Sequence, residues 1–151
     1  MAVDLVSDVT PELEAAFGRL IGQLSRSAKP MNGEQIEGFL AQDCVDLLVF
    51  RDDDGAGEAG EAPILGMLTL VTFEIPTGWR AWVEDVVVDE AARGKGVGAS
   101  LVAAAIDLAK KRGAKTVDLT SRPSREAANR LYQRAGFELR ETNVYRVTNT
   151  R

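Results

Sequence analysis

Residues 86–102 read VVVDEAARGKGVGASLV, an apolar run followed by a polar break and alternating glycines, after which the chain becomes apolar again. Alternating glycines after a strand let the backbone approach a ligand closely, and the first amides of a following helix point at that ligand with the positive end of the helix dipole. The segment therefore predicts a strand, an anion-binding loop and a helix in succession, and a phosphate suits this loop best.

Other interpretations of the glycines fit less well. The phosphate loop of nucleotide hydrolases needs GxxxxGK followed by Ser or Thr, which the sequence lacks. A dinucleotide-binding fold is a closer rival, because Gly94, Gly96 and Ala99 spell GxGxxA and Asp118 lies about twenty residues later. In that fold the glycines follow the strand almost at once, whereas residues 89–93 intervene here. A turn without a ligand would not require so many glycines, which cost backbone entropy.

The rest of the sequence predicts a mixed α/β fold. Thr10 and Pro11 are typical of a helix cap and first turn, and the apolar spacing continues this helix to about Ser27. Further helices are expected over 32–42, 97–113 and 124–136, and strands over 45–51, 64–73, 79–88 and 115–121, with one or two closing strands over 137–147. Both faces of 79–88 are apolar, which predicts a central strand. The acidic run 52–63 is expected to be a solvated loop and not a metal site.

Two features of the composition limit the chemistry. The chain of 151 residues has no histidine and a single cysteine, Cys44. Without histidine there is no Ser-His-Asp or Cys-His nucleophile pair and no HExxH zinc site, so acid and base catalysis must fall to carboxylates, lysine or tyrosine. We expect no metal cofactor. Cys44 cannot form an intrachain disulfide and is predicted to be a small buried apolar residue.

The net charge and the hydropathy of the chain indicate which partners and which location to expect. The net charge of −5, with both signs interspersed, argues against a nucleic-acid partner, and an amine substrate suits an acidic surface better. The first residues do not resemble a leader, and no apolar run approaches the roughly 18 residues that span a bilayer. We therefore expect one domain over 1–151, in the cytoplasm, without a membrane partner.

Three segments together indicate a family. Residues 93–98 match R/Q-x-x-G-x-G/A, WVEDVVV precedes them at 82–88, and NRLYQRAGF lies at 129–137. With these segments at these spacings, the chain resembles the GNAT superfamily of acyl-CoA-dependent N-acyltransferases. The resemblance implies a mixed, mostly antiparallel central sheet of about six to seven strands flanked by about four helices. It also implies a homodimer as a possible assembly.

Acetyl-CoA is the cosubstrate that the resemblance implies. Its pantetheine arm would pair, like an added strand, with the backbone of Val86, Val87 and Val88. The family often has asparagine seven residues before the helix tyrosine, where this chain has Arg125, whose guanidinium suits a phosphate contact. Asn129 would touch the pantetheine or the adenosine phosphates. The coenzyme A pyrophosphate would lie on the loop and helix start at Arg93, Gly94, Lys95, Gly96, Val97, Gly98 and Ala99.

The implied reaction is direct transfer of the acetyl group from the thioester to a primary amine, without a covalent enzyme intermediate. An alkylammonium of pKa about 10 must lose a proton, and the departing thiolate is helped by gaining one. Glu84 and Asp85 lie in an apolar strand, where a buried, unpaired carboxylate is costly, so their presence requires a reason. In a regular strand they point to opposite faces unless a bulge re-aims them.

Candidate roles follow for three side chains. Glu84 is the preferred base or ligand of the substrate ammonium, Asp85 is the second candidate, and a water relay or a purely structural role for both stays open. Tyr132 is the candidate acid, because it lies between the polar and apolar stripes of its helix and matches the tyrosine that protonates the coenzyme A sulfur in similar family members. A non-catalytic acyl-CoA sensor, which would need neither an acid nor a base, is the alternative. The acceptor, a small molecule or a protein amine, is left open.

Overall fold

The computed structural model describes residues 3–52 and 63–149. Its elements follow in the order β1 (Val3–Val6), α1 (Pro11–Leu24), α2 (Gly33–Leu40), β2 (Val45–Arg51), β3 (Ile64–Ile75), β4 (Gly78–Val88), a 3-10 turn (Glu90–Ala92), α3 (Val97–Lys111), β5 (Thr116–Asp118) and α4 (Glu126–Ala135). Within these residues five strands form one sheet in the order β1-β2-β3-β4-β5. Neighbours are antiparallel except for the parallel pair β4 and β5.

The first helix begins at its predicted cap, and the second begins within one residue of its expected start. The hydroxyl of Thr10 accepts a hydrogen bond from the backbone N–H of Leu13 at 3.1 Å, which satisfies one amide that has no intrahelical partner. In α2, Asn32 and Gln35 form a reciprocal capping box. α1 ends at Leu24, slightly before the expected Ser27. Both predicted helices are thus confirmed.

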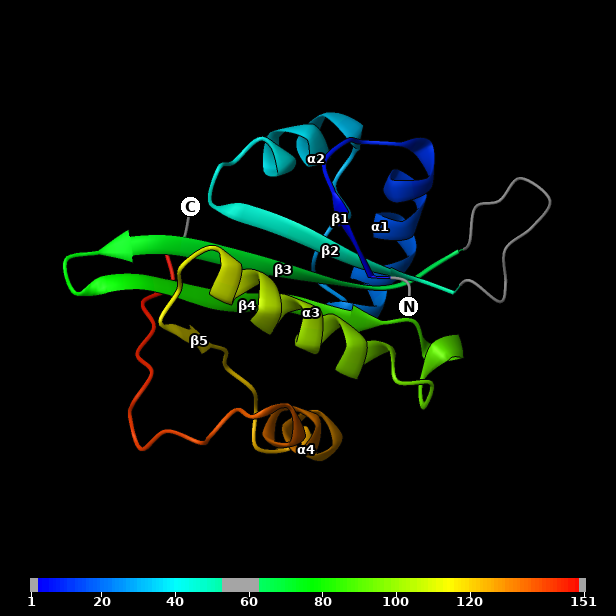
Figure 1. Cartoon of the computed structure of the whole chain (residues 1–151). Coiled ribbons are helices and arrows are strands. Elements are labelled where there is room, and N and C mark those ends of the chain that lie inside the picture. Colours follow the sequence, from blue (N-terminus) through cyan, green and yellow to red (C-terminus); the bar gives the residue numbers. More distant parts are fainter. Residues whose placement is uncertain (1–2, 53–62, 150–151) are drawn as a thin grey trace.

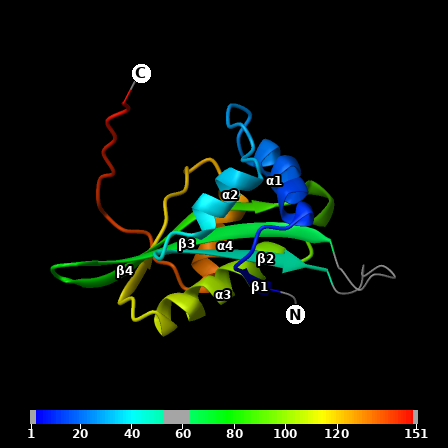
Figure 2. The same ribbon diagram turned by 90° about the horizontal axis from the view of Figure 1, so that it is seen from above.

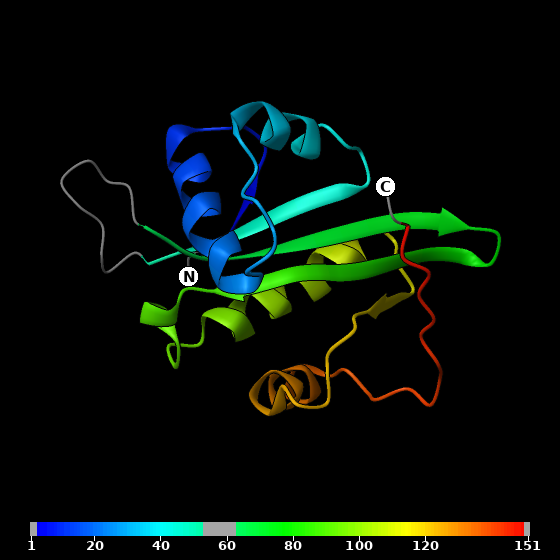
Figure 3. The same cartoon turned by 180° about the vertical axis from the view of Figure 1, so that it is seen from behind.

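The sheet is covered on both faces. α1 and α2 lie over one face, while α3 and α4 lie over the other (Figures 1 and 3). Leu47 and Val49 of β2 pack with α1 and α2, whereas Leu48 between them packs with the α3 side. Successive side chains of a strand point to opposite faces, so burial of all three means that both faces of β2 are covered. This explains why its sequence is a continuous apolar run. β4 pairs with β3 and β5, as predicted for a central strand.

Gly66 on β3 allows α3 to approach the sheet closely. A Cβ atom at this position would lie 2.8 Å from Val97 Cγ1 and 3.0 Å from the backbone oxygen of Val87. We expect Gly66→Ala to lower the free energy of unfolding by about 1 to 3 kcal/mol, because the core has no space for the added methyl group. Urea unfolding followed by circular dichroism measures this change.

Gly38 in α2 is the matched control, because a Cβ atom there meets nothing within 4 Å. Gly38→Ala is expected to raise the free energy of unfolding by about 0.5 to 1 kcal/mol through helix propensity. An unchanged free energy of unfolding in Gly66→Ala would contradict the close packing of α3 against Gly66.

Two predictions about strands differ from the structure. The expected six to seven strands are wrong for the described residues, because 137–149 contain no strand and run as an extended chain outside the five-stranded sheet (Figure 2). The alternating apolar residues there indicated a strand, but a strand needs a partner edge, and β5 offers only three residues. Leu139 and Tyr145 are consequently 93% and 87% exposed. Conversely, the short β1 carries too few residues for a period to be recognised, and it was not expected.

Cys44 is also placed differently from its prediction. It is exposed, because it lies in the turn before β2 begins at Val45, and its carbonyl accepts a hydrogen bond from the N–H of Thr72. The acidic run 52–63 falls almost wholly outside the described residues. No helix in the described part of the chain combines the length and the apolar character needed to cross a bilayer.

Candidate active site

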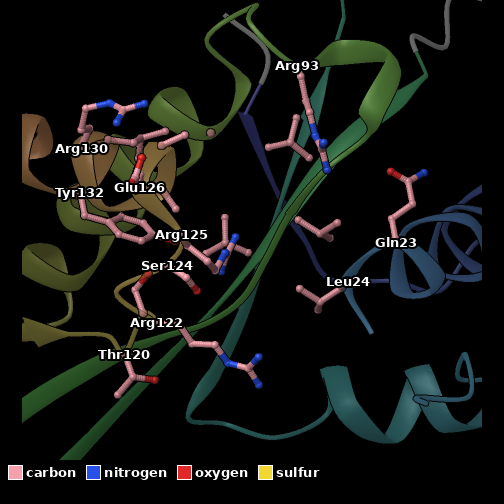
Figure 4. A pocket seen from close by; sticks show the side chains of 18 of the residues that line it. Gln23, Leu24, Arg93, Thr120, Arg122, Ser124, Arg125, Glu126, Arg130 and Tyr132 are labelled. Carbon is pink, nitrogen blue, oxygen red and sulfur yellow. The ribbon is translucent and has the colours of Figure 1, made fainter. Parts of the chain in front are cut away.

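A cleft of about 1440 Å³ opens between β4 and α4, where β4 and β5 separate (Figure 4). The two strands pair only from Arg80 to Trp82 of β4, opposite Thr116 to Asp118 of β5. Beyond Trp82 the edge of β4 is no longer paired with β5, and Val86, Val87 and Val88 line the cleft. An extended ligand arm can add to such an edge through main-chain hydrogen bonds.

A β-bulge interrupts β4 within this unpaired stretch. Thr69 of β3 pairs with Glu84 and Met67 pairs with Val87, so Asp85 and Val86 together stand opposite one residue. Asp85 has φ 48°, and among the described residues it is the one non-glycine with positive φ. A bulge of this kind re-aims side chains and bends the strand.

Glu84 and Asp85 are both exposed as a result. The expectation that they lie in a buried strand and carry a desolvation cost is therefore wrong, because the bulge turns both carboxylates to solvent. Neither residue lines the cleft, although both directly precede Val86, which does.

The glycine loop leads from the end of β4 into α3. Gly94 and Gly96 have φ 82° and 79°, in the left-handed region that glycine adopts without strain. Gly96 is the N-cap of α3 and offers no side-chain acceptor, so the N–H groups of Val97, Gly98 and Ala99 have no partner within the helix. A Cβ atom at Gly94 or Gly96 would meet nothing within 4 Å, so the loop face is open. The residues present fit an anion such as a pyrophosphate.

Hydrogen bonds from α1 hold the entrance to this loop in place. Asp89 accepts from the N–H of Ala91 and pairs with Arg19, each at 3.1 Å. The Ala91 N–H and Arg19 lower the pKa of Asp89, while partial burial opposes them. Gln23 of α1 accepts from the N–H of Glu90 at 2.9 Å. The end of α1 and the loop are thereby fixed as one wall of the cleft.

Tyr132 enters the cleft from α4. Its side chain is 8% exposed, and its ring packs edge-on against Phe137 with 6.0 Å between ring centroids. Burial raises the pKa of Tyr132, and the charge of nearby Arg125 partly opposes this. The phenol therefore keeps its proton at neutral pH and is available as a donor. In Figure 4 the side chains of Tyr132 and Arg125 point into the cleft from the α4 side, and Arg93 enters it from the opposite side.

Comparison with known proteins agrees with this architecture. The model of the acetyltransferase (GNAT) family matches residues 15–137. The chain belongs to the GNAT acetyltransferase family. It is 39% identical to an uncharacterized N-acetyltransferase of Methanocaldococcus jannaschii over 61 residues. This matching stretch covers 40% of this chain and 27% of the length of that protein.

Solved structures share the GNAT fold over almost the whole chain. An aminoglycoside acetyltransferase from an uncultured soil metagenomic sample has a TM-score of 0.81 at 16% identity, over 99% of this chain and 95% of that chain. A transcriptional regulator from Bacillus halodurans has a TM-score of 0.72 at 28% identity, over 97% of this chain and 99% of that chain. The predicted mixed α/β, mostly antiparallel fold is confirmed.

The structure of this GNAT protein brings together part of the predicted site. The predicted residues that line the cleft are Val86, Val87, Val88, Arg93, Gly98, Arg125 and Tyr132. Gly94, Lys95, Gly96, Val97 and Ala99 lie beside them in the loop and the first turn of α3. Asn129 does not line the cleft, and its side-chain amide donates to the backbone oxygen of Arg122 at 3.0 Å.

Sequence reasoning missed several residues of the GNAT cleft. These are contributed by the end of α1, the loop between β5 and α4, α4 itself and the closing segment: Gln23, Leu24, Thr120, Ser121, Arg122, Ser124, Glu126, Ala127, Ala128, Arg130, Leu131, Val144 and Arg146. The sequence SRPSR at 121–125, two serines and two arginines after a strand, is a signal that points to this loop. The Ser121 hydroxyl is buried without a hydrogen-bond partner in the described part of the chain.

Proposed function

We propose that this chain is an acetyl-CoA-dependent N-acetyltransferase that transfers the acetyl group directly to a primary amine. The observation that supports this most strongly is the arrangement of the cleft. An open glycine loop with uncapped helix amides lies at one side, an unpaired β4 edge runs along it, and the protonated Tyr132 enters from α4. A sensor that only binds acyl-CoA does not need the third of these features.

Each part of the cleft has a role toward the cosubstrate. The amides at the start of α3, together with Arg93 and Lys95, would hold the pyrophosphate, because they concentrate positive charge at an open surface. The backbone of Val86 to Val88 would hold the pantetheine arm as an added strand. Arg125 would contact the cofactor near Tyr132. Acetyl-CoA, when bound, supplies the acetyl group as a thioester.

Proton transfer is assigned to Tyr132 and to the carboxylates at the bulge. Tyr132 donates its phenolic proton to the departing sulfur, because its raised pKa keeps it protonated. Glu84 accepts the proton of the attacking ammonium, directly or through one water, and Asp85 is the second candidate. Their exposure suits a group that exchanges protons with solvent after each turnover.

The two carboxylates can be distinguished by substitution. We expect Glu84→Gln to lower kcat/KM by about 10² or more, since general base catalysis contributes roughly 10² to 10⁴. Asp85→Asn is its matched control and is expected to have a smaller effect, with acetyl-CoA affinity unchanged in both. Free-thiol release under saturating acetyl-CoA measures the rates. Full activity in the double variant would contradict a carboxylate base.

Calorimetric titration with acetyl-CoA tests the proposal, with NAD and ATP as controls. We expect micromolar binding of acetyl-CoA alone, followed by thiol release when an amine acceptor is supplied. Binding without thiol release across a broad amine panel would favour the sensor alternative. Binding of NAD in place of acetyl-CoA would overturn the proposal and restore the dinucleotide interpretation of the glycines.

The closing segment, residues 138–149, supports a homodimer. Besides Leu139 and Tyr145, Val144 and Val147 are 71% and 89% exposed, and exposed apolar groups gathered in one segment are typical of a protein interface. We expect light scattering to give the mass of a dimer, and Leu139→Ser with Val147→Ser to give a monomer. A monomeric wild-type protein would contradict this assignment.

A further inference from the structure

The cleft is strongly basic although the chain is acidic. Five arginines line it, against one carboxylate, Glu126: Arg93, Arg122, Arg125, Arg130 and Arg146. The whole chain carries a net charge of −5. Positive charge has therefore been gathered into this one concave surface, where low-dielectric walls focus the field and attract anions.

Among the described residues, the arginines of the cleft have no ion pair, as is also true of the exposed Arg134 and Arg140 outside it; what distinguishes them is that they share one concave surface. Arg19, Arg51 and Arg112 each form an ion pair with a carboxylate. Within residues 3–52 and 63–149, none of the five guanidinium groups in the cleft forms an ion pair or a hydrogen bond. All five side chains are exposed, so water and salt weaken their mutual repulsion, and a bound anion would lower what repulsion remains.

The glycine loop, which we propose binds the pyrophosphate, adjoins one end of this cluster. In Figure 4 the guanidinium groups of Arg93, Arg125 and Arg122 follow one another along the cleft. Arg93 adjoins the glycine loop, and Arg125 is close enough to Tyr132 to affect the pKa of its phenol. In the same view Arg122 lies on the far side of Arg125 from Arg93. Arg146 of the closing segment lines the same cavity.

We propose that the acceptor amine also carries an anionic group, a carboxylate or a phosphate, and that Arg122 and Arg146 bind it. Guanidinium groups match both anions with paired, charge-assisted hydrogen bonds. Holding the anion on the far side of Arg125 from Arg93 leaves the amine of the same molecule free to reach the thioester. The inference rests on the proposed acetyl transfer and narrows its substrate class. It also disfavours polycationic acceptors, although an aminoglycoside acetyltransferase shares the fold.

Matched amine pairs test the proposal on protein saturated with coenzyme A, so that the cofactor phosphates already occupy their site. Phosphoethanolamine is compared with ethanolamine, and β-alanine with β-alaninamide, while kanamycin serves as the polycation. We expect the anionic member of at least one pair to bind at least about tenfold more tightly in calorimetry. The same member should give the faster thiol release with acetyl-CoA. The preferred pair identifies phosphate or carboxylate as the recognised group.

Variants assign this preference to residues. Arg122→Gln and Arg146→Gln should each weaken binding of the anionic amine about tenfold to a hundredfold while coenzyme A affinity is kept. Arg134→Gln on α4 is the control, because this side chain is exposed and does not line the cleft.

Three results would overturn the inference. They are equal binding of the charged and neutral members of both pairs, preferred acetylation of kanamycin, and loss of coenzyme A affinity in Arg122→Gln or Arg146→Gln. The last would assign these arginines to the cofactor. Failure of the wild-type protein to bind coenzyme A would instead refute the proposed function, so the two failures are distinguishable.

Discussion

Tyr132→Phe is expected to lower kcat by about 10² to 10⁴ with little change in acetyl-CoA affinity. The substitution removes only the hydroxyl oxygen, so the ring still packs against Phe137 and the core is not opened. What is lost is the proton for the departing thiolate. Steady-state thiol release gives kcat, and calorimetry gives the affinity of the same preparation.

The pH profile distinguishes a catalytic from a structural tyrosine. Because burial raises the pKa of Tyr132, the phenol stays protonated at neutral pH and loses its proton only at strongly alkaline pH. Wild-type kcat should therefore fall as the pH rises through that raised pKa, and the residual rate of Tyr132→Phe should lack this fall. Tyr145→Phe is the control, because Tyr145 is 87% exposed. Unchanged turnover in Tyr132→Phe would remove Tyr132 from the mechanism.

Local signals in the sequence predicted much of this fold, because each depends on neighbouring residues. The cap at Thr10 bonds to an amide three residues away, so its effect is visible in the sequence itself. The glycine loop is equally local, since Gly94 and Gly96 adopt positive φ directly before the helix that they introduce. The loop was therefore predicted from the same residues that form it.

The remaining features depend on partners far away in the chain. The bulge at Asp85 was left open because it is a property of the register between β3 and β4, and no residue of β4 alone shows it. The closing strands were predicted from alternating apolar residues, but whether such residues pair depends on a free edge elsewhere. Arg122 and Arg146 were missed because they become neighbours of one cavity only when β5 diverges from β4.

A pair of substitutions at Gly96, to Asp and to Asn, tests the glycine loop, because the two variants differ from each other in charge alone. Asp and Asn have nearly the same shape and both tolerate the left-handed conformation that Gly96 adopts at φ 79°. An added Cβ atom there meets no other atom within 4 Å, so both variants are expected to fold. We expect Gly96→Asp to weaken acetyl-CoA binding at least about a hundredfold, because a like charge beside the phosphates costs several kcal/mol. Gly96→Asn should weaken it about tenfold or less.

The difference in acetyl-CoA affinity between Gly96→Asp and Gly96→Asn shows whether charge or shape decides binding. If the amides at the start of α3 hold the pyrophosphate, the added carboxylate repels the phosphates. Salt screens this repulsion, so the difference in acetyl-CoA affinity between the two variants should become smaller at high salt. Calorimetry at about 0.05 M and 0.5 M sodium chloride measures that narrowing. Equal weakening by Asp and Asn would mean that shape alone excludes the ligand. Full affinity in both would place the pyrophosphate away from residues 94–99, and the link from the glycine loop to coenzyme A would be broken.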